Sequence, residues 1–340
     1  MSLLPSGSNP SVSLIDPKYS LSPSPLFASV SRFASQFDAP GYLGRIFQSD
    51  PAWGLGSEYD PLPGALGGAP WRLFKKEELL ECIGYTGGWG FVGDSVMRET
   101  FNALLRILEV GDAVNVNVPH AQQRYESEIS LPGTTNATAR IAFRFARNLH
   151  PELGDRAKEL LQNGIQGTGL RGLVVGSGLW DLNPGQGGGG HTTALTTYAI
   201  RLAKFLREMG LFLKEKREEG GGPYRLVWRM IAPTVWSKAP IDRRDFLSNG
   251  RIEACNAIAR RFLGEAWNFF AVSKMLPPWA LVESSLLMPP GHESRVSGDG
   301  YHPTPQTLER FVHAIASEFC PEHNWDMLAI HAIAAVDNDW

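Results

Sequence analysis

The sequence predicts a three-layer α/β fold, with a parallel β-sheet between two layers of helices. Short apolar runs alternate with amphipathic helical segments over residues 71–321, and such alternation is typical of parallel sheets covered on both faces. Hydrophobic residues make up 43% of the 340 residues and charged residues 20%, which provides for a sizeable core. Ligand sites of such sheets lie at the carboxyl ends of the strands, so functional residues are expected there.

Three regions are expected along the chain. Residues 1–70 are rich in Ser, Pro and Gly and predict an irregular arm, residues 71–321 the α/β domain, and residues 322–340 a C-terminal tail. The net charge of −3 indicates no basic surface for nucleic acid. No apolar segment reaches the roughly 18 residues of a transmembrane segment, and the N-terminus shows no signal-peptide pattern.

The elements follow from hydrophobic periodicity. The first half of the domain is expected to hold, in order, a helix at 75–83, a buried strand at 89–93, an amphipathic helix at 95–108, strands at 114–118 and 139–146, and a helix at 151–161. The second half is expected to hold a strand at 173–176, a helix at about 193–216, a strand at 224–231, a helix at 246–263, a strand at 269–272, and a helix at 305–319 with Thr304 as its N-cap.

A Gly-Asp-Ser sequence follows the first predicted strand. Asp94 and Ser95 stand where a helix begins, and the positive end of a helix favours a developing negative charge on a serine oxygen. The same residues are also ordinary helix N-caps. The tripeptide by itself therefore leaves both a catalytic and a capping interpretation open.

Two further segments lie at predicted strand ends or helix starts. Asp299 and His302 are three residues apart, just before the last helix, and such a pair can activate a serine hydroxyl, with the carboxylate orienting the imidazole. Gly176–Asp181 (GSGLWD) follows a buried strand, and its glycines allow backbone N–H groups to approach a substrate oxygen. Each segment also has an ordinary structural explanation, as a polar loop and as a tight turn with a packed tryptophan.

The order Ser, Asp, His along the chain indicates nucleophilic catalysis. No G-x-S-x-G sequence is present, which excludes the nucleophile elbow of α/β-hydrolases. The segment Trp89–Arg98 (WGFVGDSVMR) resembles the G-D-S block of the PC-esterase group of the GDSL/SGNH hydrolase superfamily, and Asp299–His302 (DGYH) is similar to its D-x-x-H block. That group includes plant trichome-birefringence-like polysaccharide O-acetyltransferases, and the catalytic domains of sialate O-acetyltransferases and of fungal capsule-polysaccharide O-acetylation proteins. The resemblance spans roughly residues 71–320.

The resemblance implies an SGNH-hydrolase-like fold and a role for each matching residue. Ser95 would be the nucleophile, His302 the general base and then acid, and Asp299 the residue that orients His302, with Asp94 in support. Gly178 and Arg98 would help to bind the oxyanion or the substrate. An Arg98 paired with Asp94 or a carbonyl group is the structural alternative.

One position departs from the broader SGNH pattern. Its third block is G-x-N-D, whose Asn donates to the oxyanion, whereas this chain has Trp180 at that place. An indole N–H is only a donor and its large apolar ring suits a sugar face. Trp180 is therefore expected to contact the sugar, with backbone N–H groups and Arg98 left to bind the oxyanion.

The implied reaction is O-acyl transfer, with acetyl as the first candidate, onto carbohydrate hydroxyls through a seryl-acyl intermediate. Carbohydrate acetylesterase activity and a catalytically silent carbohydrate-binding relative are the alternatives. No bound cofactor is expected, and an acetyl donor such as acetyl-CoA would be a co-substrate. The partner would be a glycan, and the family implies the secretory pathway, the Golgi lumen or the extracellular space.

Other patterns carry less information. Gly185–Gly190 satisfies G-x-G-x-x-G only because it is a run of glycines, so a flexible flap is favoured over a cofactor loop. The histidines show no metal-ligand spacing, and no metal is expected. Cys82 and Cys320 could form a disulfide, although buried free thiols are the default for them, and the state of Cys255 is left open.

Overall fold

The computed structural model describes residues 73–110, 123–132, 138–162, 170–182, 191–235, 237–244, 247–267, 276–288 and 295–320. The strands are β1 (Trp89–Gly93), β2 (Arg124–Ser130), β3 (Thr138–Phe145), β4 (Gly172–Gly176), β5 (Arg225–Arg229) and β6 (Trp279–Val282). The helices are α3 (Lys76–Tyr85), α4 (Ser95–Leu108), α5 (Gly154–Gln162), α6 (His191–Glu218), α7 (Asn249–Arg260), α9 (Ser284–Leu287) and α10 (Pro305–Phe319). Shorter helical segments are η2 (Leu149–Leu153), η4 (Ile241–Arg243) and η5 (Arg261–Ala266).

The six strands form one sheet in the order β2-β3-β1-β4-β5-β6. All neighbouring pairs are parallel except β2 and β3, which are antiparallel. In the register of the sheet, Gly93 lies beside Phe145 on one side and Gly176 on the other. The carboxyl ends of β1, β3 and β4 therefore lie level, and the loops that follow them share one edge.

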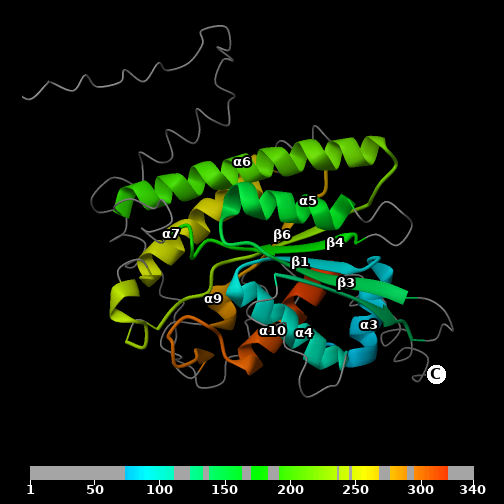
Figure 1. Ribbon diagram of the computed structural model, residues 1–340, viewed down its shortest axis with the longest axis horizontal. Coiled ribbons are helices and arrows are strands. Elements are labelled where there is room, and N and C mark those ends of the chain that lie inside the picture. Colours follow the sequence, from blue (N-terminus) through cyan, green and yellow to red (C-terminus); the bar gives the residue numbers. More distant parts are fainter. Residues whose placement is uncertain are drawn as a thin grey trace, which may run out of the picture.

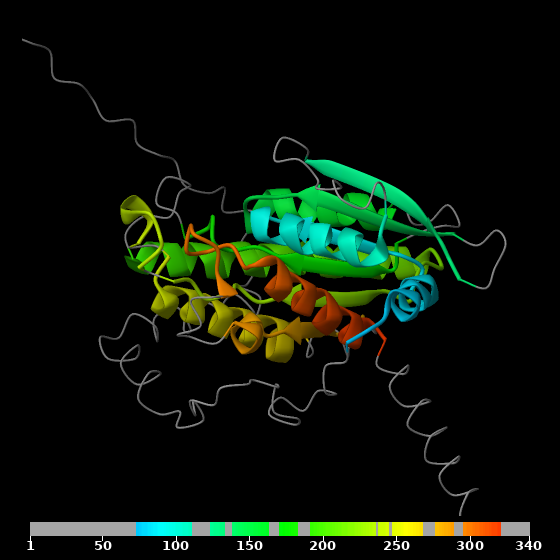
Figure 2. The ribbon, with the colours of Figure 1, turned by 90° about the horizontal axis from the view of Figure 1, so that it is seen from below.

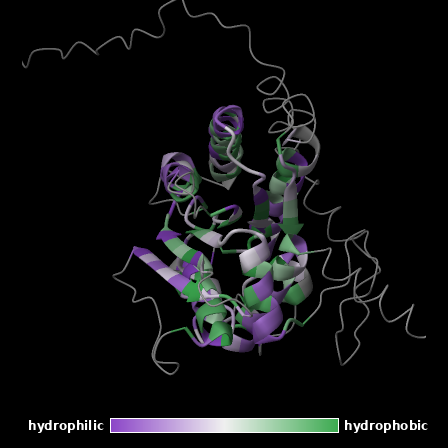
Figure 3. Ribbon diagram, turned by 90° about the vertical axis from the view of Figure 1, so that its right-hand side faces the viewer, coloured by the Kyte–Doolittle hydropathy of each residue, from purple (hydrophilic) through white to green (hydrophobic). Residues whose placement is uncertain are grey.

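Helices cover both faces of this sheet, which confirms the α/β expectation (Figure 1). Helices α5, α6 and α7 pack with one hydrophobic cluster, and α3, α4 and α10 with the other. The helices turn their hydrophobic residues toward the sheet and their hydrophilic residues outward (Figure 3). The sheet is thus buried between two apolar layers. Polar residues can gather in the loops at the carboxyl ends of its strands.

Several elements have the predicted bounds, and others differ. The strand at 89–93 and the helices at 95–108 and 305–319 are found as expected. The antiparallel strand β2 and the short β6 were not predicted, so the sheet is mixed rather than wholly parallel. The predicted strands at 114–118 and 269–272, the glycine loop at 185–190, the arm at 1–70 and the tail at 322–340 lie outside the described residues.

The two missed strands differ from the predicted strands in composition or in length. β2 is an edge strand whose exposed positions carry charges, such as Arg124 and Glu126, and charged edges protect a sheet from further pairing. β6 has four residues, too few for a clear period. Thr304 occupies the N-cap position of α10, but its hydroxyl lies 3.0 Å from the Thr307 hydroxyl and caps no backbone N–H.

A disulfide joins the two ends of the described fold. Cys82 in α3 and Cys320, directly after α10, are bonded, with their Cα atoms 5.9 Å apart. Of the two states that the sequence left open, the disulfide is therefore found, and not the free thiols taken as the default. Figure 2 shows α3 beside the last turn of α10. Packing of these helices brings the sulfur atoms together across 238 residues, which the spacing of the cysteines in the sequence does not show. Cys255 is a buried free thiol.

Candidate active site

The turn after β1 positions Asp94 and Ser95 at the start of α4. Gly93 ends the strand, and a Cβ atom built on it would lie 2.0 Å from the carbonyl oxygen of Gly176. Only glycine therefore allows β1 and β4 to approach so closely at this edge. The chain then leaves the sheet and enters the helix within two residues.

Asp94 caps helix α4. Its side chain is buried, and Oδ1 accepts hydrogen bonds from the N–H groups of Val96 (3.1 Å) and Met97 (3.4 Å). Burial raises the pKa of Asp94, and the buried guanidinium of Arg229 opposes that shift. Ser95, the first helical residue, is thereby held at the positive end of α4 with its side chain directed out of the sheet edge.

Ser95, His302 and Asp299 form a continuous hydrogen-bonded line. His302 Nε2 lies 2.8 Å from Ser95 Oγ, and His302 Nδ1 lies 2.5 Å from Asp299 Oδ2. A carboxylate beside Nδ1 favours the tautomer with the proton on that nitrogen, so Nε2 is the acceptor for the serine hydroxyl. The structure thus brings together the three residues that the sequence predicts as a triad, although 207 positions separate Ser95 from His302.

Asp299 is held as a carboxylate by several donors. Its Oδ1 accepts from the Ser297 hydroxyl (2.7 Å) and from the N–H groups of Tyr301 (3.1 Å) and His302 (3.0 Å). Partial burial alone would raise the pKa of Asp299, but the hydrogen bonds from His302, Ser297 and the two backbone N–H groups lower it to about 2. The carboxylate is therefore charged at neutral pH and can stabilise an imidazolium.

The loop that carries His302 is fixed to the rest of the fold. Gly300 has φ of 81°, and a Cβ atom there would lie 2.5 Å from the backbone nitrogen of Ala239. Its carbonyl oxygen accepts from Val235 N–H at 2.7 Å, and the Ser297 N–H donates to the carbonyl oxygen of His302 at 2.8 Å. The first contact joins the His302 loop to the segment after β5, and the second closes the loop on itself. Together they fix the position of the imidazole beside Ser95.

The Gly176–Asp181 segment lies beside this site. Gly178 has φ of 142°, and a Cβ atom on it would lie 2.5 Å from Ile231 Cδ1, so glycine is required. Within the described part of the chain, neither the Ser95 N–H nor the Gly178 N–H has an acceptor. Asp181 points away into the core, where it accepts from Arg201 (2.6 Å) and from Leu149 N–H (3.2 Å), and burial raises its pKa to about 6.

A small pocket of about 60 Å³ opens beside the serine. Its lining residues are Asp94, Ser95, Leu179, Trp180, Arg243, Leu247 and Tyr301. The guanidinium of Arg243 donates to the Tyr301 hydroxyl at 2.9 Å and lies over its ring. Tyr301 and Arg243 were not predicted from the sequence, although Tyr301 lies within the D-G-Y-H segment.

Arg98 does not line this pocket. Its side chain is buried, and its guanidinium lies 5.9 Å from the centre of the Phe145 ring. Burial lowers the pKa of Arg98, against the attraction of Glu99 and Asp94. The Arg98 side chain is therefore packed against Phe145 rather than in the pocket, and its role in oxyanion binding stays a prediction.

Glu99 is a site residue that was not predicted from the sequence. Its carboxylate oxygen lies 3.8 Å from His302 Nε2, and burial raises its pKa, against the opposing effect of His302. Glu99 follows Ser95 by four residues on α4, and residues with that spacing share one helical face. That spacing is the sequence signal that would have placed it here.

Replacement of Asp299 by Asn is expected to lower the kcat of a reaction at Ser95 by about 10³–10⁴-fold, because the amide supports the wrong imidazole tautomer of His302.

The pKa of Asp299 in the folded protein, about 2, lies below the ordinary value of 3.8. The Asp299 carboxylate therefore stabilises the fold above pH 4, and this contribution to stability is lost as the pH falls toward 2. Thermal unfolding of the wild type and of Asp299→Asn, measured from pH 7 to pH 2, tests this contribution. The difference in Tm between wild type and Asp299→Asn should be constant above pH 4 and narrow below it; a difference that widens on acidification would contradict this assignment.

Among the described residues, no group of three or more His, Cys, Asp or Glu residues is arranged to hold a metal ion. Nor does any helix in those ranges combine the length and apolar character needed to cross a membrane. No protein-family model matches this chain, and a comparison with curated protein sequences gives no match either. Function is therefore inferred from the geometry of the site.

Proposed function

We propose that the protein is a serine-dependent acyltransferase of the SGNH type that moves an acyl group, acetyl in the first instance, onto a carbohydrate hydroxyl. The observation that carries the proposal is the Ser95–His302–Asp299 line, with contacts of 2.8 and 2.5 Å. Nucleophile, base and orienting carboxylate within hydrogen-bond reach are the arrangement that nucleophilic acyl transfer requires. The position of the serine after the first strand of the sheet supports the SGNH resemblance.

The first half-reaction follows from these contacts. Ser95 Oγ attacks the carbonyl carbon of the acyl donor while His302 Nε2 accepts the hydroxyl proton. The negative charge on the tetrahedral intermediate would be stabilised by the N–H group of Ser95, at the positive end of α4, and by the N–H group of Gly178 in the loop after β4. His302 then returns the proton to the leaving group, and the acyl group remains on Ser95.

The second half-reaction runs in reverse with a new acceptor. A sugar hydroxyl donates its proton to His302 Nε2 and attacks the acyl carbon. The tetrahedral intermediate then collapses as His302 passes that proton to Ser95 Oγ, which releases the acylated sugar and restores the free serine. Asp299, with its pKa at about 2, stays ionised and stabilises the imidazolium in both steps.

A pocket of about 60 Å³ suits an acyl group of a few heavy atoms. The disulfide between Cys82 and Cys320 fits an oxidising compartment, such as the secretory pathway that the family resemblance implies.

The direct test has two arms. p-Nitrophenyl acetate with an acyl-serine probe reports whether Ser95 becomes acylated. Mass spectrometry of candidate polysaccharides, acetylated and deacetylated, with and without acetyl-CoA, then identifies the acceptor. Gain of acetyl groups supports a transferase, loss without transfer indicates an acetylesterase, and sugar binding without labelling of Ser95 indicates a silent carbohydrate-binding relative.

Alanine at Trp180 is expected to raise KM for the sugar acceptor about tenfold with little change in kcat, because an aromatic face is lost from the pocket. The indole lines the pocket next to Ser95 and lies outside the hydrogen-bonded line of His302 and Asp299. Steady-state kinetics with varied acceptor measures the split between KM and kcat. Trp180→Phe, which keeps a ring, should recover most of the lost affinity, and a selective fall in kcat would assign Trp180 to the oxyanion instead.

A further inference from the structure

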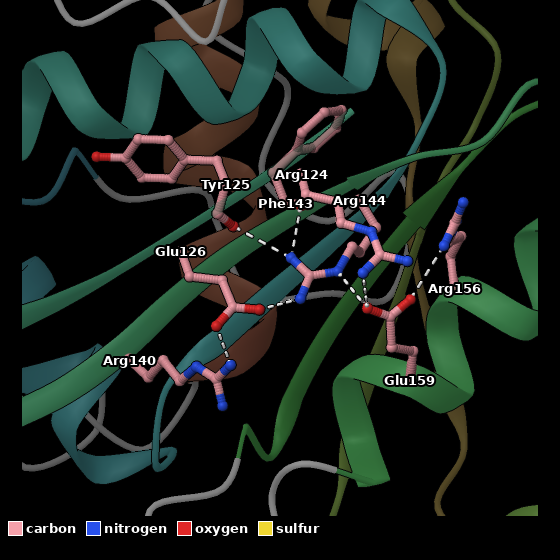
Figure 4. Close-up of polar contacts among 8 residues, drawn as sticks. All are labelled: Arg124, Tyr125, Glu126, Arg140, Phe143, Arg144, Arg156 and Glu159. Atoms are coloured by element: carbon pink, nitrogen blue, oxygen red, sulfur yellow. Dashed lines mark hydrogen bonds and ion pairs between the residues drawn. The ribbon is translucent and has the colours of Figure 1, made fainter. Parts of the chain in front are cut away.

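A cluster of charged side chains lies between the β2–β3 edge of the sheet and helix α5 (Figure 4). We call it the arginine cluster, and its members are Arg124, Arg140, Arg144, Arg156, Glu126 and Glu159. Arg144 is its buried centre, with Nε donating to Glu159 at 3.0 Å and a terminal nitrogen donating to Glu126. The proposed acyl transfer uses none of these residues.

The cluster holds more positive than negative charge. Four guanidinium groups share two carboxylates, and Glu159 alone contacts Arg124 (3.3 Å), Arg144 (3.0 Å) and Arg156 (3.1 Å). Glu128 lies opposite Arg140 in the strand register, so the excess of positive charge is at the Arg124 and Arg156 end. Burial lowers the pKa of Arg144, and the charges of Arg124 and Arg156 lower it further.

That end of the cluster reaches solvent mainly through Arg124. The side chain of Arg124 is 59% exposed and that of Arg156 is 25% exposed, whereas that of Arg144 is 3% exposed. Arg124 and Arg156 each use one terminal nitrogen for Glu159, and a guanidinium has five N–H donors. Each of these two guanidinium groups therefore keeps N–H donors that could bind a carboxylate of a ligand.

The cluster also continues toward the pocket. Arg144 pairs with Val92 in the parallel register, one residue before β1 ends. Arg147 follows three residues later, within about 11 Å of Arg144 along the backbone, and its exposed guanidinium lies 5.6 Å from the centre of the Trp180 ring. Because Trp180 lines the pocket, Arg147 brings a further guanidinium to the rim of the site, two residues after the strand that carries Arg144.

We propose that the Arg124 and Arg156 end of the arginine cluster is a secondary binding site for the carboxylate groups of an acidic polysaccharide. The arginines already bind two carboxylates of this chain, and a guanidinium fork matches a carboxylate in two parallel hydrogen bonds. The site lies on the surface between strand β2 and helix α5 rather than in a cavity, and such a surface suits a chain with repeated charges rather than a small anion. The choice of a polysaccharide as ligand rests on the proposed function.

Isothermal titration calorimetry of the full chain tests this proposal. The background is Ser95→Ala, so that no acyl transfer occurs, and the probe is a six-residue oligogalacturonate, with its methyl-esterified form as the uncharged match. The double variant Arg124→Gln/Arg156→Gln should bind the acidic hexamer about tenfold more weakly, since the two guanidinium groups that would pair with carboxylates of the hexamer are lost. Binding of the esterified hexamer should not change.

Two controls separate a specific site from general charge. Arg310→Gln removes one positive charge from an exposed position on α10, which packs on the opposite face of the sheet, and should leave binding unchanged. Arg124→Lys/Arg156→Lys keeps the charge without the planar fork and should bind with intermediate affinity. With Ser95 retained, p-nitrophenyl acetate hydrolysis by the double Gln variant should stay within about twofold of wild type, because local screening limits distant charge effects.

Three results would overturn the proposal: no binding of the acidic hexamer by the wild-type cluster, equal binding of the esterified form, or equal weakening by Arg310→Gln. None of them depends on catalysis. Conversely, if the wild type showed no acyl transfer but still bound the acidic hexamer at the arginine cluster, the proposed function would be overturned and the binding site would stand.

Discussion

Replacement of Ser95 by alanine is expected to lower kcat for acyl transfer by about 10⁶-fold, because the nucleophile is lost and only binding and backbone donors remain. His302→Ala should cost nearly as much, since Nε2 is the acceptor 2.8 Å from the serine hydroxyl. The two residues act as one unit, so the double variant should be no slower than either single variant. Burst-phase kinetics with p-nitrophenyl acetate and intact-mass measurement of the acyl-enzyme provide the readout.

Ser130 on β2 supplies a matched control for this experiment. Its side chain is exposed, and it pairs with Thr138 at the start of β3, the end of that strand remote from the site, so Ser130→Ala should retain wild-type rates. Thermal unfolding should place all of these variants within a few degrees of the wild type, because Ser95 contributes one half-buried hydroxyl. Retention of wild-type activity by Ser95→Ala would rule out the seryl-acyl mechanism.

Removal of the disulfide is expected to produce the largest change in stability. In the chain-entropy account, a bond that closes a loop of 238 residues restricts the unfolded chain by about 5 kcal/mol. For a domain of this size, such a loss lowers Tm by about 10 °C or more. Differential scanning calorimetry of Cys82→Ala/Cys320→Ala against wild type measures it, and treatment of the wild type with a reductant should produce a similar shift.

The double alanine variant provides the internal control, because its remaining cysteine, Cys255, is a buried free thiol that takes no part in the disulfide. Reductant should leave the Tm of the double alanine variant unchanged, since no disulfide remains in it to be broken. A reductant-induced shift of equal size in that variant would show that the effect does not come from the Cys82–Cys320 bond.

Local structure near the site, and the chemistry available to it, can be read from the amino-acid sequence. The apolar run at 89–93 and the stripe at 95–108 are local patterns whose periods match a strand and a helix. The Gly-Asp-Ser turn follows from them, because a glycine at a strand end and an aspartate at a helix start have defined physical roles. Ser95, Asp299 and His302 are triad candidates on their residue types, order and expected places at strand ends and helix starts.

Which distant residues meet depends on tertiary packing. Ser95 and His302 are brought to 2.8 Å by the parallel sheet and by the backbone contacts of Gly300, and packing of α3 against α10 joins Cys82 to Cys320. The same packing buries Arg98 against Phe145, places Glu99 beside His302, and gathers the arginine cluster from β2, β3 and α5. Local periodicity indicates which face of an element is apolar, whereas contacts between elements depend on the summed packing of the whole core, which no short segment encodes.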